Sequence, residues 1–249
     1  MFKPFALLVI LIGVWTTPAL AQTAARCAPY QEQTVAMDLE VATGMAASAA
    51  AAVGDTDTFA KWFGVYSDQN AEQVRAAFKQ VHAKLLSQRL ALVCATKSDG
   101  SCQEAFAWVL PATGVIRLCP AYFSLPSMDR AHGGADINLG SREGALIHEI
   151  SHAVAGTDDH CTTWAGCRTL AARSPSSAVA SANSYESFAE DIRLQLLAAE
   201  AASLGSGHVH DTPGSRYRGL CSRTRSDGEL SLIPISFLQR EPSRVCRER

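Results

Sequence analysis

The residues best suited to chemistry in this 249-residue chain form one short stretch, His148-Glu149-Ile150-Ser151-His152. On a helix, two histidines four residues apart lie on one face and can offer two imidazole nitrogens to a single ion. Glu149 lies beside them, where it can take a proton from a water molecule. Zinc accepts nitrogen and oxygen ligands, and a catalytic zinc keeps one position for water. The stretch therefore predicts a hydrolytic zinc centre.

The surrounding sequence predicts that this stretch is helical. Ser141 is a good N-cap, and Glu143 falls in the first turn, where the helix dipole favours a negative charge. Gly156 is a good helix stop. Apolar residues recur at roughly helical spacing between these ends, at Leu146, Ile147, Ile150 and Val154.

Two histidines do not complete a zinc site, so the chain must supply a third ligand. Gly156 ends the predicted helix where the next few residues can fold back under the metal. Asp158, Asp159 and His160 lie within reach. His160 does not fit the metzincin pattern, because the glycine and the third histidine of that pattern stand at other spacings.

The chain resembles a known family at several separate motifs. The histidine stretch, followed by Gly156-Thr157-Asp158-Asp159, is similar to the deuterolysin, or aspzincin, metallopeptidases, in which H-E-x-x-H precedes G-T-x-D. The resemblance is closest to the peptidyl-Lys metalloendopeptidase type and covers roughly residues 55 to 192. Other segments that resemble family motifs, in the same order, are Lys61-Trp62-Phe63-Gly64, Leu118-Cys119-Pro120-Ala121-Tyr122-Phe123 and the block from Ser181 to Glu190.

The resemblance implies a ligand set and a catalytic base. His148, His152 and Asp159 are the implied ligands of one zinc ion, and Glu149 is the implied base. The interval from His152 to Asp159 is shorter than is usual in the family, so Asp158 is a rival ligand.

A second rival assignment comes from another class of zinc peptidase. Enzymes of the thermolysin type take their third ligand as a glutamate from a later helix. Glu186 or Glu190 could serve in this way, which would leave Asp159 with a structural role.

Two positions depart from the pattern that the resemblance implies. The family has a tyrosine three residues after its ligand aspartate, thought to stabilise the oxyanion, and this chain has Thr162 there. His160 is an alternative oxyanion donor. Lysine-specific members bind the lysine after the cut with an aspartate and a glutamate, and the matching residues are Asn183 and Glu186. One carboxylate is kept and one is a neutral amide, which predicts a weaker preference for lysine.

Residues 1–21 have the features of a secretory signal peptide. Lys3 provides the positive charge near the N-terminus, residues 5–14 are apolar, and Ala19-Leu20-Ala21 is a small-residue cleavage site. The apolar run is too short to span a bilayer, and we expect no membrane span after its removal. Lys3 is the only charged residue removed, so the formal net charge moves from −2 to −3. This small charge argues against nucleic acid as a partner.

The eight cysteines of an exported chain predict disulfides. None forms a C-x-x-C pair, which argues against a structural cysteine–zinc site. The resemblance indicates Cys27 with Cys94 and Cys102 with Cys119. We further expect Cys161 with Cys167, which would brace the loop after the histidine helix, and Cys221 with Cys246, which would close the tail.

The remaining elements predict a helix-rich α+β fold. Helices are expected over residues 36–53, 71–92 and 184–199, from alanine content or helical apolar spacing. Residues 105–110 and 115–118 flank turn residues and predict a β-hairpin. We expect a zincin-like fold with a small, mostly antiparallel sheet beside the histidine helix, and this sheet would hold an extended substrate.

The sequence thus predicts a secreted zinc endopeptidase, extracellular or periplasmic, that acts as a monomer on proteins or peptides. The alternative is an inactive, disulfide-braced binding protein on the same scaffold. The expected regions are a signal peptide (1–21), an N-terminal extension with an alanine-rich helix (22–54), the metallopeptidase domain (55–200) and a C-terminal extension (201–249). From Arg216 onward the last region has eight arginines against four acidic residues.

Overall fold

The computed structural model describes residues 27–87, 90–110, 112–131 and 137–205. The predicted signal peptide, the C-terminal extension beyond residue 205 and the predicted pair Cys221–Cys246 lie outside the described residues. The described elements are, in chain order, α1 (Pro29–Ala52), α2 (Asp57–Phe63), α3 (Asp68–Leu85), β1 (Ala91–Cys94), the 3-10 helix η1 (Gly100–Gln103), β2 (Ala107–Leu110), β3 (Val115–Leu118), the 3-10 helix η2 (Pro120–Ser124), α4 (Met128–Ala131), α5 (Arg142–Ala155), α6 (Trp164–Arg173), α7 (Pro175–Val179) and α8 (Ala182–Gly205).

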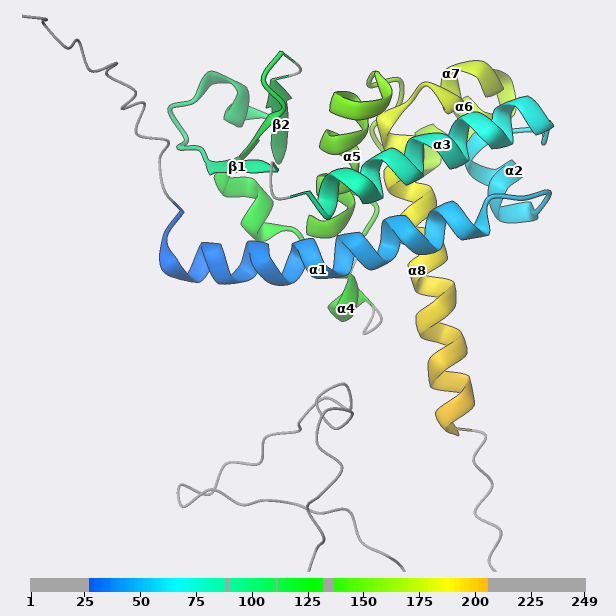
Figure 1. Cartoon of the computed structure of the whole chain (residues 1–249), viewed down its shortest axis with the longest axis horizontal. Helices are drawn as coiled ribbons and strands as arrows, with labels where there is room; N and C mark the ends of the chain where they lie inside the picture. Colours follow the sequence, from blue (N-terminus) through cyan, green and yellow to red (C-terminus); the bar gives the residue numbers. More distant parts are fainter. Residues whose placement is uncertain (1–26, 88–89, 111, 132–136, 206–249) are drawn as a thin grey trace, which may run out of the picture. The chain divides into compact units, whose positions relative to one another are not determined.

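Long helices form most of the core. α1 packs along α3, and both helices pack against α5, which carries the two histidines (Figure 1). α8 packs against α5, α1 and α2. Aromatic side chains fill the space between α2, α3 and the first half of α8; these are Phe59, Trp62, Phe63, Phe78, Tyr185 and Phe188.

The predicted helices are present, with different ends. α1 begins at Pro29, earlier than predicted, because proline suits the first turn of a helix and the Gln31 side chain caps the backbone N–H of Ala28 (2.9 Å). The prediction that the next helix reaches residue 92 is wrong. α3 ends at Leu85, and residues 91–94 instead form β1, because they pair with β3.

The three strands form a mixed sheet in the order β1-β3-β2. β2 and β3 are antiparallel and form the predicted hairpin, with Gly114 in the turn at φ 63°. β1 pairs with β3 in parallel, so only one of the two strand pairs is antiparallel. Within the described residues β2 lies at an edge of the sheet, and it packs against α5. The helix-rich α+β fold is confirmed.

Three of the four predicted disulfides are present in the described residues. Cys27–Cys94 joins the start of α1 to β1, Cys102–Cys119 joins η1 to the end of β3, and Cys161–Cys167 closes a short loop after the histidine helix. Of the helices in the described part, none is both long and apolar enough to cross a membrane.

Polar contacts fix the N-terminal end of α5. The Ser141 hydroxyl accepts a hydrogen bond from the backbone N–H of Gly144 (3.0 Å), as predicted for an N-cap. Glu190 of α8 accepts from both the backbone N–H (2.7 Å) and the hydroxyl (2.6 Å) of Ser141. Arg142 then donates to Asp38 of α1 (2.9 Å), which is buried. Helices α1 and α8 therefore both hold the start of the histidine helix.

Candidate metal centre

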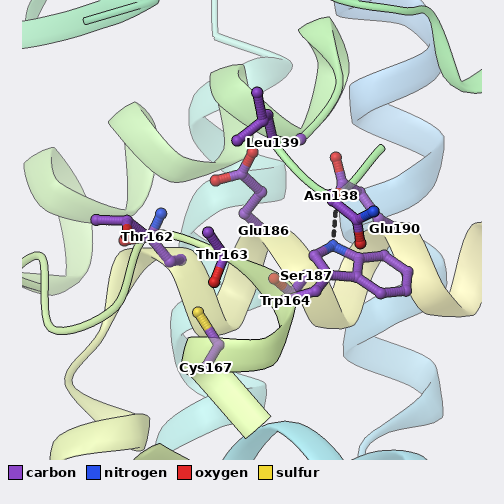
Figure 2. A pocket seen from close by; sticks show the side chains of 11 residues that line it. Asn138, Leu139, Thr162, Thr163, Trp164, Cys167, Glu186, Ser187 and Glu190 are labelled. Carbon is purple, nitrogen blue, oxygen red and sulfur yellow. Dashed lines mark hydrogen bonds between the residues drawn. The ribbon is translucent and has the colours of Figure 1, made fainter. Parts of the chain in front are cut away.

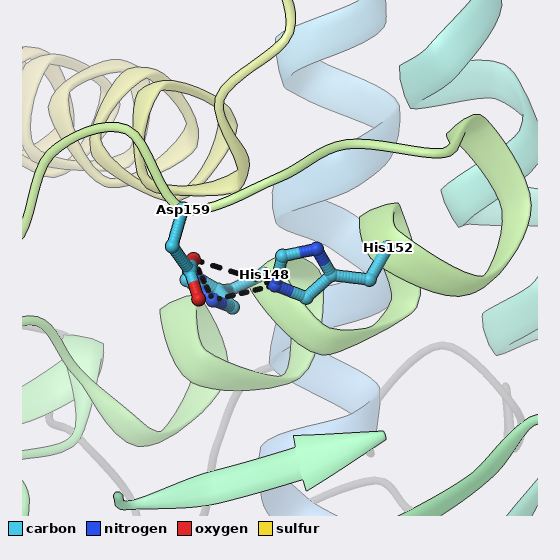
Figure 3. A group of neighbouring side chains, drawn as sticks. All are labelled: His148, His152 and Asp159. Atoms are coloured by element: carbon cyan, nitrogen blue, oxygen red, sulfur yellow. Dashed lines mark hydrogen bonds and ion pairs between the residues drawn. The ribbon is translucent and has the colours of Figure 1, made fainter. Parts of the chain in front are cut away.

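The two histidines extend from consecutive turns of α5. Their Nε2 atoms lie 3.0 Å apart and their ring centroids 4.7 Å apart (Figure 3). Leu146, Ile147 and Ile150 of the same helix are completely buried. Packing of these apolar side chains fixes the rotation of the helix, so it also fixes the direction of both imidazoles.

The loop after α5 brings a carboxylate to the histidines. Gly156 ends the helix in the left-handed conformation, at φ 65°. A parallel β-bridge then joins Asp158 to Ser181, just before α8, and fixes the path of the loop. As a result, Asp159 Oδ1 lies 3.1 Å from His148 Nε2 and 3.4 Å from His152 Nε2 (Figure 3).

The outer nitrogens of both imidazoles are hydrogen-bonded to groups that only accept. His152 Nδ1 lies 2.6 Å from the backbone carbonyl of Thr157, and His148 Nδ1 lies 3.1 Å from Glu186 Oε2. A carbonyl and a carboxylate require a donor, so Nδ1 carries the proton in each ring. Each neutral imidazole therefore directs the lone pair of its Nε2 atom towards the other ring and Asp159.

This arrangement fits a metal ion. Two imidazole nitrogens and one carboxylate oxygen face one another within 4.8 Å, and all three are acceptors when the rings are neutral. Facing acceptors are mutually repulsive unless a cation lies between them. Two nitrogens and an oxygen form a donor set that zinc prefers, and three protein ligands are typical of catalytic zinc.

The electrostatics of the cluster also favour positive charge. Burial by itself lowers the pKa of His148, but hydrogen bonds with Asp159 and Glu186 outweigh it and raise that pKa to about 10. Hydrogen bonds with His148 and His152 hold the pKa of Asp159 well below its usual range. The Asp159 carboxylate is therefore ionised throughout the neutral pH range.

Glu149 lies beside the histidines and faces a cleft. Its side chain is buried, and its Oε1 atom lies 4.0 Å from His148 Nε2. Burial raises the pKa of Glu149, although the nearby histidines His148 and His152 lower it. A carboxylate whose pKa is raised towards neutrality is suited to taking and returning a proton.

The cleft has a volume of about 450 Å³. It lies between α5, the sheet and the loop that follows α5 (residues 156–159). Ala107, Trp108 and Val109 of β2 line it, opposite Glu149 and His152. Alternate residues of a strand point to opposite faces, so three consecutive lining residues indicate that β2 presents its edge. Backbone groups at that edge are therefore available to an extended peptide.

A second, smaller pocket is lined by residues of α6, of α8 and of the turn before α5 (Figure 2). Its volume of about 20 Å³ suits a single water molecule. Glu186, Glu190, Asn183 and Thr162 contribute to its polar wall. Gly140 faces Glu186 Oε1 so closely that a side chain on the glycine would collide with it. Glu186 thus turns Oε2 to His148 and Oε1 to this pocket.

Glu190 is fully buried, and its hydrogen bonds join three parts of the structure. It accepts hydrogen bonds from Ser141 and from the indole N–H of Trp164 (3.2 Å) (Figure 2). Burial raises its pKa to about 8, with a further contribution from nearby Glu186, although the hydrogen bonds from Ser141 and Trp164 oppose this shift. Glu190 connects α8 to α5 and α6.

The structure separates the candidate ligands that the sequence left open. Asp159 is the carboxylate that approaches both Nε2 atoms, whereas Glu186 contacts the opposite side of the His148 ring. Asp158 is held by its backbone groups, which bond to Ala180 and Ala182. The Glu190 carboxylate accepts hydrogen bonds from Ser141 and Trp164.

The predicted oxyanion donors and substrate residues lie in different surroundings. His160 is exposed, and exposed Thr162 lies on the wall of the small pocket (Figure 2). Asn183 and Glu186 come from the first two turns of α8 and contact the metal cluster. Sequence reasoning missed the contact of Thr157 with His152, although Thr157 is part of the G-T-x-D motif.

Comparison with known proteins identifies the family. The sequence profile of the aspzincin M35 family, described as lysine-specific metallo-endopeptidases, matches residues 48–190. The chain belongs to this family. This confirms the predicted resemblance and membership of a zinc metalloendopeptidase family.

The chain is also similar to individual proteins. The chain is 29% identical over 173 residues to an extracellular protease of Aeromonas hydrophila, covering 67% of this chain and 46% of that protein. It is 32% identical over 139 residues to a peptidyl-Lys metalloendopeptidase of Pleurotus ostreatus, covering 55% of this chain and 74% of that one. The chain thus spans less than half of the Aeromonas relative.

A solved structure of this family supports the fold. The zinc peptidase from Grifola frondosa matches with a TM-score of 0.56 and 25% sequence identity. The match covers 66% of this chain and 97% of the Grifola chain. Almost the whole of that compact peptidase therefore has a counterpart here.

Proposed function

We propose that the protein is a zinc-dependent endopeptidase that hydrolyses peptide bonds of proteins outside the cytoplasm. The observation that carries this proposal is the convergence of His148 Nε2, His152 Nε2 and Asp159 Oδ1. Membership of the aspzincin family supports it, as does the open cleft with a strand edge on one wall.

His148, His152 and Asp159 would hold one zinc ion. When bound, zinc lowers the pKa of a water molecule towards neutrality and polarises a carbonyl group. Thr157 and Glu186 keep both imidazoles in the tautomer that leaves Nε2 free, and they restrict the rotation of the rings.

Glu149 is the proposed general base. Its carboxylate accepts the proton of the attacking water and then returns it to the nitrogen of the leaving amine. Burial raises the pKa of Glu149, which makes its carboxylate a better proton acceptor than an ordinary glutamate.

The substrate is proposed to bind along β2. An extended peptide in the cleft would add to the free edge of this strand through main-chain hydrogen bonds. Binding of this kind is compatible with many substrate sequences, because the hydrogen bonds are made to the peptide backbone. It places the peptide between β2 and α5, opposite Glu149 and His152.

His160 and Thr162 are the two proposed oxyanion donors. Both follow Asp159 closely in the chain, and both are exposed. We expect His160→Ala or Thr162→Val to lower kcat with little change in KM, because an oxyanion donor acts mainly in the transition state. The variant that shows this pattern identifies the donor.

A preference for lysine after the cut is the finer proposal. Asn183 and Glu186 match the lysine-binding pair of the lysine-specific members, and both lie near the start of α8. One carboxylate attracts a cation less strongly than two, so the expected result is a partial preference. Mapping the cut sites in a denatured protein tests it, and cuts with no excess of lysine would contradict it.

We further propose that the protein is secreted as a monomer after removal of residues 1–21. Three disulfides within the described part support an oxidising compartment. The name of the Aeromonas relative, an extracellular protease, agrees with this. The proposed regions after the signal remain 22–54, 55–200 and 201–249.

Casein digestion tests the enzyme proposal. The wild-type protein should digest casein, chelator treatment should stop it, and added zinc should restore it. Glu149→Gln should bind zinc as the wild type does, but lose roughly 10²- to 10⁴-fold in kcat/KM. Activity that persists under both treatments contradicts the mechanism. Zinc binding without any cleavage by the wild type would instead support the binding-protein alternative.

A further inference from the structure

The first two turns of α8 face the loop that carries Asp159 with two polar side chains. Asn183 and Glu186 stand three residues apart, so they lie on the same side of the helix. Glu186 bonds to His148, one of the proposed ligands. Asn183 is directed at the same cluster from one turn earlier.

Asn183 donates to the ligand carboxylate. With its NH₂ group towards the loop, the amide donates to Asp159 Oδ1 (3.3 Å) and to the backbone carbonyl of Cys161. The opposite orientation would turn the amide oxygen towards these two oxygens and is unfavourable. The accepting atom, Oδ1, is the oxygen that approaches both imidazoles.

Asp159 needs such a contact more than the histidines do. Its side chain is 60% exposed, against 13% for His148 and 15% for His152. An exposed carboxylate that packing does not hold can rotate away and exchange its two oxygens. A hydrogen-bond donor to Oδ1 favours one rotamer of Asp159, and it keeps Oδ1, not Oδ2, directed at the imidazoles.

We propose that Asn183 is a positioning residue that holds Asp159 in its metal-binding orientation. This inference rests on the proposed function of the site. An amide is suited to the role because it donates to a carboxylate without adding charge beside the ion. A carboxylate at position 183 cannot donate when ionised, and it would repel Asp159.

Zinc titration of the metal-free protein tests this proposal without measuring activity. The dissociation constant is measured by competition with a chromophoric chelator for the wild type, Asn183→Asp and Asn183→Ala. Asn70→Asp is the matched control, because it makes the same chemical change in α3, away from the cluster. We expect the Asn183 variants to bind zinc roughly 10- to 100-fold more weakly, with Asn183→Asp the weaker binder, and the control to bind as the wild type does.

Cobalt(II) substitution adds a spectroscopic readout. The visible spectrum of bound cobalt should change in both Asn183 variants and stay constant in the control, because the spectrum reports ligand geometry. Thermal unfolding of the metal-free proteins checks that each variant is folded, and Asn183→Ala decides the question if Asn183→Asp is unfolded. Unchanged zinc affinity and spectrum in folded variants would overturn the role of Asn183. A wild-type protein that binds no zinc would overturn the proposed function itself.

Discussion

The metal cluster has two halves that are held in place by different forces. His148 and His152 come from α5, whose apolar residues are buried among α1, α3 and α8. Asp159 comes from an exposed loop that a β-bridge, a disulfide and the Asn183 amide hold in place. The geometry of the helix half depends on the stability of the whole core, whereas the geometry of the loop half depends on a few local polar contacts.

Breaking the helix half should have the largest effect on stability. Ile147→Ala removes a completely buried side chain from α5, so we expect a loss of about 2–5 kcal/mol in the free energy of unfolding. Denaturant unfolding of the metal-free protein measures this. Asp159→Asn in the loop half is the comparison and should cost less, because the Asp159 side chain is 60% exposed and solvent screens its ion pairs. Equal losses in both variants would contradict the division into two halves.

Glu186→Gln should affect metal binding more than folding. The glutamine oxygen can still accept from His148 Nδ1, but the negative charge that strengthens this bond is lost. We expect zinc affinity to fall roughly 10- to 100-fold. Zinc competition measures it, with Glu200→Gln, near the exposed end of α8, as the control. Wild-type affinity in Glu186→Gln would show that His148 needs no charged partner.

Removing the loop disulfide should have a smaller effect on stability. The double variant Cys161→Ala, Cys167→Ala frees a short loop, so the chain-entropy cost is about 2 kcal/mol at most. We also expect weaker zinc binding, because the segment after Asp159 gains freedom. Unfolding and zinc titration measure the two effects. Unchanged zinc affinity would mean that the bridge at Asp158 and the Asn183 amide hold the loop without the disulfide.

A further effect is expected on the pH dependence of stability. The pKa of Glu190 is raised to about 8 in the folded protein, against an ordinary value of 4.5. Between these values the folded state binds more protons than the unfolded state, so stability falls as pH rises from about 5 to about 8. Glu190→Gln should flatten this decline in the metal-free protein. Parallel wild-type and variant stability curves would exclude Glu190 as its source.

Local sequence signals predicted much of the helix half. The Ser141 cap, the apolar spacing and Gly156 gave both ends of α5, and the spacing of the two histidines gave their common face. A second cap was missed. α6 begins at Trp164, because the Thr163 hydroxyl accepts a hydrogen bond from the backbone N–H of Gly166.

The loop half and its supports depend on contacts between distant residues. The sequence left Asp158 and Asp159 open, because the β-bridge to Ser181 decides which carboxylate turns inwards. The contact of Glu186 with His148 joins residues 38 positions apart. The parallel pairing of β1 with β3 was missed for the same reason. The helical spacing of apolar residues predicted a helix up to residue 92, but residues 91–94 pair with β3 and form a strand.

The close approach of α5 and its preceding turn to α8 depends on two residues without side chains. A methyl group on Gly140 would occupy the position of Glu186 Oε1, and one on Gly144 the position of Glu190 Oε1. Vacant volume at these positions is therefore a requirement for this packing, although neither glycine has a functional group. A list of essential residues drawn up only from reactive side chains would omit both, and a designer grafting this centre onto another scaffold would need to copy the empty space with the ligands.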